Sequence, residues 1–322
     1  MNFFKNKLVL VTGGAGFIGS HLVEALVGFG AKVTVPTLSL KPTPFLSAVK
    51  DKINLVTADL KNPAAAQKVV KGQDLIFHLA AHVGGVHYNQ IHPATLLYEN
   101  SLPAINVFAA AKSHPPQRLL YVSSACVYPR ECSFPTQESE GFLNEPEITN
   151  YGYGWGKRIG ELFAKTYAQE FKLKVGIVRP YNAYGPRDNF DPKSSHVIPA
   201  LVKRVIDGEN PLVVWGDGSA TRSFIYIDDI VRGMLLAIEK YPRPDPINLG
   251  TKEEISVRDL ARLIVKLAGT ETKIVFDQAK PSGQPRRNCA AGKAQKLLGF
   301  KAETTLNQGL PQVIDYYKKT HG

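Results

Sequence analysis

The sequence predicts an α/β protein with a doubly wound parallel sheet and a smaller C-terminal lobe. Short apolar segments alternate with amphipathic helical segments through roughly the first 180 residues. A glycine-rich turn joins the first apolar segment, Val9 to Thr12, to a helix in which Ile18, Leu22 and Leu26 recur at helical spacing. The alternation stops beyond Asn182, where the chain becomes rich in proline and loops. These observations predict a strand, turn and helix repeat followed by a separate lobe.

The glycine-rich turn predicts a dinucleotide site of the Rossmann type. Its glycines follow a strand at a spacing of three residues. A glycine accepts positive φ and lets a pyrophosphate approach the backbone, and the helix that follows supplies unpaired N–H groups. The expected cofactor-binding residues of this turn are Gly13, Gly16, Phe17, Ile18 and Gly19.

The chain is expected to divide at the end of the alternating pattern. Residues 1–181 form the dinucleotide-binding domain in this interpretation, and residues 225–250 return to it with a further strand and helix. Residues 182–224 and 251–322 form the substrate-binding lobe. Because no low-complexity linker separates the two parts, we expect a rigid cleft between them.

Composition narrows the class of protein further. The 322 residues carry a net charge of +11, which suits an anionic ligand, but the cations are not gathered into a patch typical of nucleic-acid binding. No apolar run approaches the roughly 20 residues of a membrane span, and no signal-type segment precedes the first strand, so we expect a cytoplasmic protein that binds neither membrane nor nucleic acid. Three cysteines without a C-x-x-C pattern indicate no metal site.

The end of the second strand bears on which nicotinamide cofactor is bound. An Asp or Glu there normally holds the adenosine ribose hydroxyls of NAD. Here Pro36 and Thr37 occupy the position, and no carboxylate follows until Asp51. Lys41 and Lys50 lie in the same loop, either as solvated charges or as partners of a 2′-phosphate. The loop favours NADP, with NAD as the alternative.

A second set of residues carries a family resemblance. Ser124 ends the fifth strand, and Tyr153 and Lys157 lie four residues apart on the next helix, so that both point to one side. Together with TGGAGFIG, LAA and RPYNAYGP, these residues resemble the extended short-chain dehydrogenase/reductase family, also called the NAD-dependent epimerase/dehydratase family, from roughly Lys7 to Tyr317.

The resemblance implies a catalytic Ser124, Tyr153 and Lys157. A lysine charge close to a phenol favours the phenolate, so Tyr153 would exchange a proton with a sugar oxygen near neutral pH while hydride moves to or from nicotinamide. Lys157 would also hold the nicotinamide ribose, and Asn100 would orient Lys157. The remaining cofactor-binding residues that the resemblance implies are Asp59 and Leu60 at the adenine, Ala80 and Pro180.

Within the family, the segments VGGV, SACVYP, YGPRDNFDPKSSHVIPALVKR, WGDGSATRSF and VFDQAKPSGQPRR resemble the GDP-L-fucose synthase branch. This implies epimerisation beside a 4-keto group and NADPH-dependent reduction at C4 of a GDP-sugar. Epimerisation needs a base on one face of the sugar and an acid on the other, and Cys126 and His196 match the pair that does this work. From the residues alone, Cys126 is more typical of a small core residue and His196 of a surface residue, and only the resemblance favours the catalytic roles. The implied substrate-binding residues are Asn182, Arg204, Trp215, Arg222 and Arg286.

Three alternatives stay open at this stage. One is an NAD-retaining 4-epimerase resembling UDP-glucose 4-epimerase, and another is an enzyme resembling GDP-mannose 3,5-epimerase. A cofactor-binding scaffold without activity is disfavoured because Ser124, Tyr153 and Lys157 are all present. The resemblance also implies a homodimer, formed through the helix that carries Tyr153 and the helix from Ala94 to Ala111. The candidate interface residues are Phe163, Tyr167, Leu97 and Phe108.

Overall fold

A seven-stranded parallel sheet forms the centre of the protein. The computed structural model describes residues 2–39, 44–280 and 284–321. The order of the strands is β11-β6-β5-β4-β1-β2-β3, so the chain starts at the middle, runs outward to one edge and then returns to build the other half. The strands are β1 (Leu8–Thr12), β2 (Lys32–Thr37), β3 (Ile53–Thr57), β4 (Leu75–His78), β5 (Arg118–Val122), β6 (Val175–Pro180) and β11 (Ile247–Leu249).

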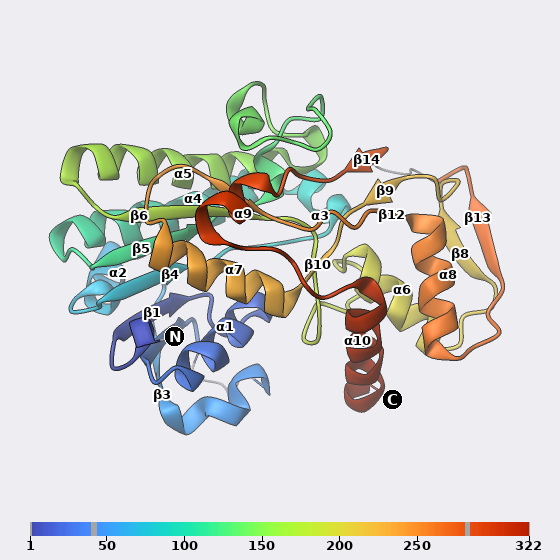
Figure 1. Ribbon diagram of the computed structural model, residues 1–322, viewed down its shortest axis with the longest axis horizontal. Helices are drawn as coiled ribbons and strands as arrows, with labels where there is room; N and C mark the ends of the chain where they lie inside the picture. The colour runs from blue at the N-terminus through green and yellow to red at the C-terminus, as the bar shows by residue number, and fades with distance from the viewer. Residues whose placement is uncertain (1, 40–43, 281–283, 322) are drawn as a thin grey trace.

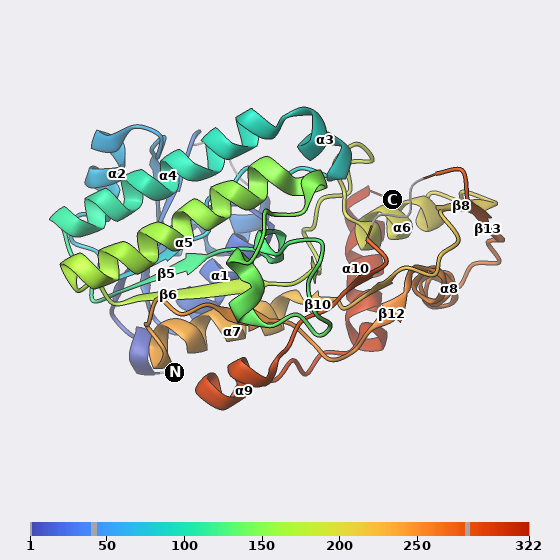
Figure 2. The ribbon, with the colours of Figure 1, turned by 90° about the horizontal axis from the view of Figure 1, so that it is seen from above.

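Helices cover both faces of the sheet, as the doubly wound fold requires. Figure 2 shows α2 (Pro63–Val70), α4 (Pro93–Ser113) and α5 (Tyr151–Phe171) on one face, where α4 and α5 lie side by side. The opposite face carries α1 (Phe17–Gly28) and α7 (Ile227–Lys240), which contact each other. The strand order and this arrangement confirm the fold class predicted from the sequence.

Local sequence accounts for several helix boundaries. Asn62 caps α2 through its side-chain oxygen, which accepts from the N–H groups of Ala64 and Ala65, and Pro63 suits the first helical position. The helix α5 ends at Lys172, which takes the left-handed conformation with φ 57°. Its span matches the apolar periodicity of the sequence, which predicted a helix over the same residues.

A smaller lobe lies beside the carboxyl ends of the sheet strands (Figure 1). It contains α6 (Val197–Ile206), α8 (Val257–Ala268) and α10 (Leu306–His321). Three small β structures accompany them: a parallel pair of β8 (Leu212–Trp215) and β13 (Ile274–Asp277), a pair of β7 (Ala183–Tyr184) and β10 (Ile225–Tyr226), and a sheet of β12 (Ile255–Ser256), β9 (Thr221–Arg222) and β14 (Arg286–Arg287). The remaining helices are α3 (Val86–Ile91), α9 (Gly292–Leu298), and the 3-10 turns η1 (Asn2–Phe4), η2 (Pro44–Lys52), η3 (Ala125–Val127), η4 (Glu138–Phe142) and η5 (Ile148–Asn150).

Two helix boundaries differ from the expected ones. The sequence pattern predicts a helix from Ile255 to Ala268, but Ile255 and Ser256 form strand β12, and the Ser256 hydroxyl then caps α8 by accepting from the N–H of Asp259. The pattern also predicts a last helix near Leu310 to Tyr317, which begins instead at Leu306 and contains Pro311. Both differences arise at helix starts, where side-chain caps and packing, and not periodicity, decide the first residue.

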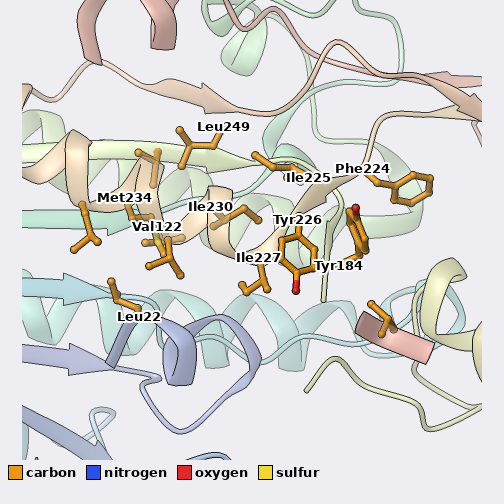
Figure 3. Packing of buried hydrophobic residues seen from close by; sticks show 14 of the residues in the cluster. Leu22, Val122, Tyr184, Phe224, Ile225, Tyr226, Ile227, Ile230, Met234 and Leu249 are labelled. Atoms are coloured by element: carbon orange, nitrogen blue, oxygen red, sulfur yellow. The ribbon is translucent and has the colours of Figure 1, made fainter. Parts of the chain in front are cut away.

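The main apolar core extends from the sheet into the smaller lobe. Figure 3 shows part of it, in which Ile230 and Met234 of α7 lie between Leu249 of β11 and Leu22 of α1. The same cluster continues to Leu310 of α10. A core that crosses from one part to the other disfavours free relative motion of the two parts. The division of the chain into two domains stays a prediction.

A second core lies under the helices on the opposite face, and it corrects one expectation. Phe108 of α4 was expected on an outer face, yet it is fully buried, with its ring centroid 6.1 Å from that of Tyr121 and 6.3 Å from that of Phe163. Leu97, in contrast, is exposed, as is Leu162 of α5. The outer surface of this helix pair therefore carries Leu97 and Leu162, and Phe108 belongs to the monomer core.

The described residues form neither a membrane-spanning helix nor a cluster of metal ligands. Across residues 2–39, 44–280 and 284–321, none of the helices has the length and apolar character needed to cross a membrane. The same residues contain no group of three or more His, Cys, Asp or Glu side chains arranged to hold a metal ion.

Candidate active site

A large cleft lies between the carboxyl ends of the sheet strands and the smaller lobe. Its volume is about 1630 Å³, which exceeds the usual size of a single drug-like site and leaves room for two ligands. One end is walled by the glycine turn after β1 and the start of α1, and the other by α6 and β14. Parallel α/β sheets bind ligands at this edge, where the strand order reverses between β1 and β4.

The glycines of the turn have different structural tasks. Gly13 has a φ of +70°, and a Cβ there would lie 2.8 Å from the backbone nitrogen of Ala80. A Cβ on Gly19 would overlap the carbonyl oxygen of Gly13, so Gly19 lets α1 pack closely on the turn. A Cβ on Gly16 would meet only the carbonyl oxygen of Gly13, at 3.4 Å. Gly16 thus leaves open space at the cleft.

This open space fits the diphosphate of a dinucleotide. Gly16 is the N-cap of α1 and offers no side-chain acceptor to the first N–H groups of the helix. These donors and the positive end of the helix dipole favour a negatively charged group. Phe17, Ile18 and Gly19 line the cleft at the same point. The turn therefore meets the requirements of a dinucleotide cradle on its geometry.

The other predicted cofactor residues divide into two groups. Pro180, Tyr153 and Lys157 line the cleft. Asp59, Leu60, Ala80 and Asn100 are not among its lining residues. Asn100 holds the segment after β4 instead: its side-chain oxygen accepts from the N–H of His82 at 3.0 Å, and its amide donates to the His82 carbonyl at 3.0 Å.

The end of β2 and the two described residues after it, 36–39 together, contain no acidic side chain. Pro36 is buried, and the Thr37 hydroxyl donates to the carbonyl of Ser39 at 2.8 Å. Lys41, one of the two candidate cations, lies outside the described residues. Lys50 is exposed in η2, while Pro44 and Phe45 of the same turn line the cleft.

Ser124, Tyr153 and Lys157 come together at the centre of the cleft. Ser124 follows β5, and its hydroxyl oxygen accepts from the N–H of Cys126 at 3.1 Å. Tyr153 and Lys157 lie one turn apart on α5, and both are buried. The ammonium of Lys157 donates to the carbonyl of Val122 at 2.9 Å and lies 5.8 Å from the centroid of the Tyr153 ring. Tyr153 is hydrogen-bonded to Ser124.

Burial governs the protonation of this set. It raises the pKa of Tyr153, an effect that the Cys126 charge reinforces and that the hydrogen bond to Ser124 and the charge of Arg287 only partly offset. Burial also lowers the pKa of Lys157 to about 8. The sequence led us to expect that Lys157 would lower the pKa of Tyr153. In the structure burial raises the pKa of Tyr153 instead, and Tyr153 holds its proton at neutral pH.

Cys126 and His196 line the same cleft as the Ser, Tyr and Lys set. A guanidinium nitrogen of Arg287 donates to the Cys126 sulfur at 3.5 Å. The His196 side chain is exposed to the cleft, where desolvation by the surrounding cleft walls and the charge of Arg287 lower its pKa, so its imidazole is neutral near pH 7. One thiol, one neutral imidazole and one cation therefore share this end of the cleft.

Arg287 was missed in the sequence, where the neighbouring Arg286 was chosen. Successive residues of a strand point to opposite sides, and β14 contains both arginines. Arg286 points away and forms two hydrogen bonds with Glu254, at 2.8 and 2.9 Å, whereas Arg287 lines the cleft. Two adjacent arginines in a strand must point to opposite sides, and the sequence shows that they are adjacent. The sequence does not show which of the two faces the cleft, because that depends on how β14 is placed in its sheet.

The predicted substrate-binding residues are only partly brought together. Asn182 and Arg222 line the cleft, and burial lowers the pKa of Arg222 to about 10. Arg204 is paired with Glu209 and donates to the carbonyl of Val213 at 2.6 Å. Trp215 is 59% exposed. Neither these two residues nor Arg286 is among the lining residues of the cleft.

Asp188 is a further lining residue that the sequence analysis did not single out. It is buried, one of its carboxyl oxygens accepts from the N–H of Asn189 at 2.7 Å, and the other has no hydrogen-bond partner within the described part of the chain. Burial raises the pKa of this carboxyl to about 7. No local sequence signal distinguishes it from an ordinary loop aspartate.

The fold and the cleft define the class of this protein: it is an NAD(P)-dependent enzyme built on a Rossmann-type sheet. The sequence model of the NAD dependent epimerase/dehydratase family matches residues 9–250, and the chain belongs to that family.

Relatives and solved structures agree with this assignment. GDP-L-fucose synthase 1 of Arabidopsis thaliana is 32% identical over 319 residues, which cover 98% of this chain and 94% of the relative. GDP-L-fucose synthase of Escherichia coli (strain K12) is 30% identical over 322 residues, which cover 96% of each chain. The crystal structure of UDP-glucose 4-epimerase from Thermotoga maritima with UDP-glucose superposes with a TM-score of 0.88 at 28% identity, covering 98% of this chain and 99% of that one.

Proposed function

We propose that this protein acts on a nucleotide-diphosphate sugar, epimerises carbons beside a 4-keto group and reduces C4 with NADPH; its similarity to proteins named GDP-L-fucose synthase supports a GDP-sugar as the substrate class. The observation that carries the proposal is the shared cleft of Cys126 and His196 with Ser124, Tyr153 and Lys157. Two acid–base groups are available there beyond those that proton transfer at C4 requires.

The glycine turn and α1 would hold the dinucleotide through its diphosphate, and Lys157 would hold the nicotinamide ribose. The cofactor supplies the hydride that reaches C4. Tyr153 then supplies the proton to the C4 oxygen, and its raised pKa suits a proton donor at neutral pH. The Ser124 hydroxyl, already bonded to Tyr153, would donate to the same oxygen.

Cys126 and His196 would exchange protons at the carbons next to the ketone. The carbonyl makes these C–H groups acidic, so a base removes a proton from one face and an acid returns one to the other. Arg287 supports the role of Cys126 because its guanidinium donates to the sulfur and holds the side chain at the cleft. A neutral His196 is able to accept the proton or, once charged, to return it.

Cations and an amide that line the cleft would bind the nucleotide diphosphate. These residues are Arg222, Arg287 and Asn182, and Arg287 also contacts Cys126. Asn182 donates to the carbonyl of Ser223 at 2.8 Å, which fixes its orientation. A guanidinium presents planar donors that match phosphate oxygens. The formal net charge of +11 favours the approach of such an anion.

Isotope exchange tests the proposal directly. The protein is incubated in D₂O with a GDP-4-keto-6-deoxy-hexose, and the sugar is analysed by mass spectrometry with and without NADPH. We expect deuterium beside C4 with the wild type, and its loss with Cys126→Ser and with His196→Asn, while both variants still oxidise NADPH with a 4-keto sugar. Cys132→Ser and His114→Asn, which change residues that do not line the cleft, are the matched controls. Exchange that is unaffected by the two variants would refute the assigned roles.

A second candidate is an NAD-retaining 4-epimerase, which the similarity to the Thermotoga maritima UDP-glucose 4-epimerase favours. Such an enzyme oxidises and re-reduces C4 with no net use of cofactor. It would incorporate no deuterium beside C4, would leave NADPH unconsumed and would interconvert UDP-sugars that differ at C4. The same incubation with UDP-glucose therefore separates the two activities.

Two further properties belong to this proposal. We propose a preference for NADPH over NADH, supported by the absence of a carboxylate from residues 36–39. A fluorescence titration in which NADH binds tenfold more tightly than NADPH would refute this preference.

We also propose a homodimer through α4 and α5, supported by exposed Leu97, Tyr98 and Leu162 on those helices. Sedimentation velocity that gives a monomer at micromolar concentration would refute the dimer. The cytoplasmic location stays a prediction.

A further inference from the structure

A buried ion pair lies directly behind the catalytic set. Glu161 continues the stripe of α5 that carries Tyr153 and Lys157, because the three residues are spaced by four. The side chains of Glu161 and Arg179 are 0% and 1% exposed. Arg179 belongs to β6 and immediately precedes Pro180, which lines the cleft. Because burying two charges is costly, a pair in this position calls for a specific reason.

Several hydrogen bonds fix Glu161 and Arg179 relative to each other, and we call this buried pair the clamp. Two nitrogens of the Arg179 guanidinium donate to the two oxygens of Glu161, at 2.8 and 2.7 Å. The third nitrogen donates to the Tyr128 hydroxyl at 2.9 Å and to the Glu138 carbonyl at 2.7 Å. Gly141 makes room for the guanidinium, since a Cβ there would overlap it. All three nitrogens are engaged, so Arg179 is fixed rather than free to turn toward a ligand.

Glu161 also reaches the end of β5. The Ser123 hydroxyl donates to a Glu161 oxygen at 2.5 Å. Ser123 lies between Val122, whose carbonyl accepts from Lys157, and Ser124, which is bonded to Tyr153. Three consecutive residues of one segment are thus joined to three successive turns of α5. The joined pairs are Val122 with Lys157, Ser123 with Glu161 and Ser124 with Tyr153.

Glu161 also supplies negative charge near the buried cation Lys157. Lys157, Arg158 and Arg179 are all buried, and Glu161 is the carboxylate on the same helix face. Of the other groups that face Lys157, Tyr121 stays neutral because burial raises its pKa. His78 also stays neutral, because burial and the charge of Lys157 lower its pKa to about 3. Tyr153 is protonated. Cys126 and then Glu161 are the neighbouring groups that raise the pKa of Lys157 against its burial, and Glu161 is the carboxylate of the two.

We propose that Glu161 and Arg179 are positioning residues of the active site: the clamp fixes Ser124, Tyr153 and Lys157 relative to one another, and the Glu161 carboxylate is the counter-charge of the Lys157 ammonium. Neither residue lines the cleft, so neither touches substrate or cofactor. The inference rests on the proposed function only in that it takes Ser124, Tyr153 and Lys157 as the catalytic set.

Direct titration of Lys157 tests the counter-charge without any sugar substrate. Lysine labelled with ¹³C at Cε is incorporated, the Lys157 signal is assigned with Lys157→Met, and its midpoint is followed by NMR. Glu161→Gln keeps the shape of the side chain and removes its charge, and we expect the Lys157 midpoint to fall from about 8 by about one pH unit or more. Glu161→Asp keeps the charge and should restore the midpoint. Glu170→Gln, on the exposed side of the same helix, is the control and should leave it unchanged.

The clamp is tested by Arg179→Lys, which keeps the charge and loses the two-pronged contact. We expect kcat for NADPH oxidation with a 4-keto sugar to fall about tenfold with KM unchanged, and the Lys157 midpoint to stay. A midpoint that does not move in Glu161→Gln, or that Glu161→Asp fails to restore, overturns the counter-charge, and an unchanged kcat in Arg179→Lys overturns the clamp. Absence of NADPH oxidation in the wild type would instead count against the proposed function, and the NMR titration would still decide the role of Glu161.

Discussion

Replacing Asp188 by Asn is expected to stabilise the protein in a pH-dependent manner. The carboxyl of Asp188 is buried, and one of its oxygens has no hydrogen-bond partner among the described residues. Asn has nearly the same shape, keeps an oxygen for the N–H of Asn189 and carries no charge to desolvate. The substitution therefore removes the cost of ionising a buried acid and changes little else.

The magnitude follows from the raised pKa of Asp188. Burial moves it from 3.8 to about 7. Below pH 4 the carboxyl is protonated in both the folded and the unfolded chain, so it contributes no difference. Between pH 4 and 7 only the unfolded chain loses the proton, and the free energy of unfolding of the wild type falls by about 1.36 kcal/mol per pH unit. Above pH 7 the penalty is constant at about 4 kcal/mol, which is what Asp188→Asn should recover.

Urea unfolding of both proteins at pH 5, 6, 7 and 8 measures the effect as a difference, in which other titrating groups cancel. Asp191→Asn is a control from the same loop with the opposite sign. The pKa of Asp191 is lowered by hydrogen bonds from the N–H of Lys193 and the hydroxyl of Ser194, so its carboxylate favours the folded state above pH 4. That variant should be no more stable than the wild type at any of these pH values.

A stability gain for Asp188→Asn that is the same at pH 5 and pH 8 would refute the reasoning, because a gain independent of pH cannot come from a proton. A loss of stability at pH 8 would refute it as well. In that case the carboxylate would have a partner that outweighs its burial.

Two other predictions concern the glycine turn and the phenol. Gly19→Ala should lower the free energy of unfolding by about 1–3 kcal/mol, because the added Cβ overlaps backbone that cannot move. Gly16→Ala should change the free energy of unfolding by less than about 0.5 kcal/mol and weaken NADPH binding about tenfold. If the two variants had equal effects on unfolding and on NADPH binding, measured by fluorescence titration, the roles assigned to the two glycines would be contradicted. Tyr153→Phe should reduce NADPH-dependent reduction of a 4-keto sugar by about 10²–10⁴-fold with the Kd for NADPH unchanged within twofold, and a variant that keeps its activity would remove Tyr153 from the reaction.

The parts of the fold that were predicted depend on local sequence. The alternation of apolar strands with amphipathic helices, and the glycines between the first strand and helix, specify the sheet because each element carries its own pattern. The short strands of the smaller lobe carry no such pattern. β12 has only two residues and was read as the start of the following helix, since its partner in β9 lies more than thirty residues away along the chain.

The candidate site was predictable where the spacing of residues fixes geometry. Tyr153 and Lys157 share a face of α5 because they are four residues apart, and a helix imposes that relation without help from the rest of the protein. Arg286 and Arg287 show the limit of this reasoning. Which of the two enters the cleft depends on how β14 pairs with β9, and a shift of one residue would exchange them.

The protonation states of the site residues are harder still to predict from the sequence, because they depend on how deeply each side chain is buried. Lys157 was expected to lower the pKa of Tyr153, and the motif contains nothing that opposes this effect. In the folded protein burial raises the pKa of Tyr153 instead. The same holds for Asp188, whose sequence neighbours are polar. A motif therefore identifies the groups of an active site, whereas the packing of distant segments decides which of them carry protons at neutral pH.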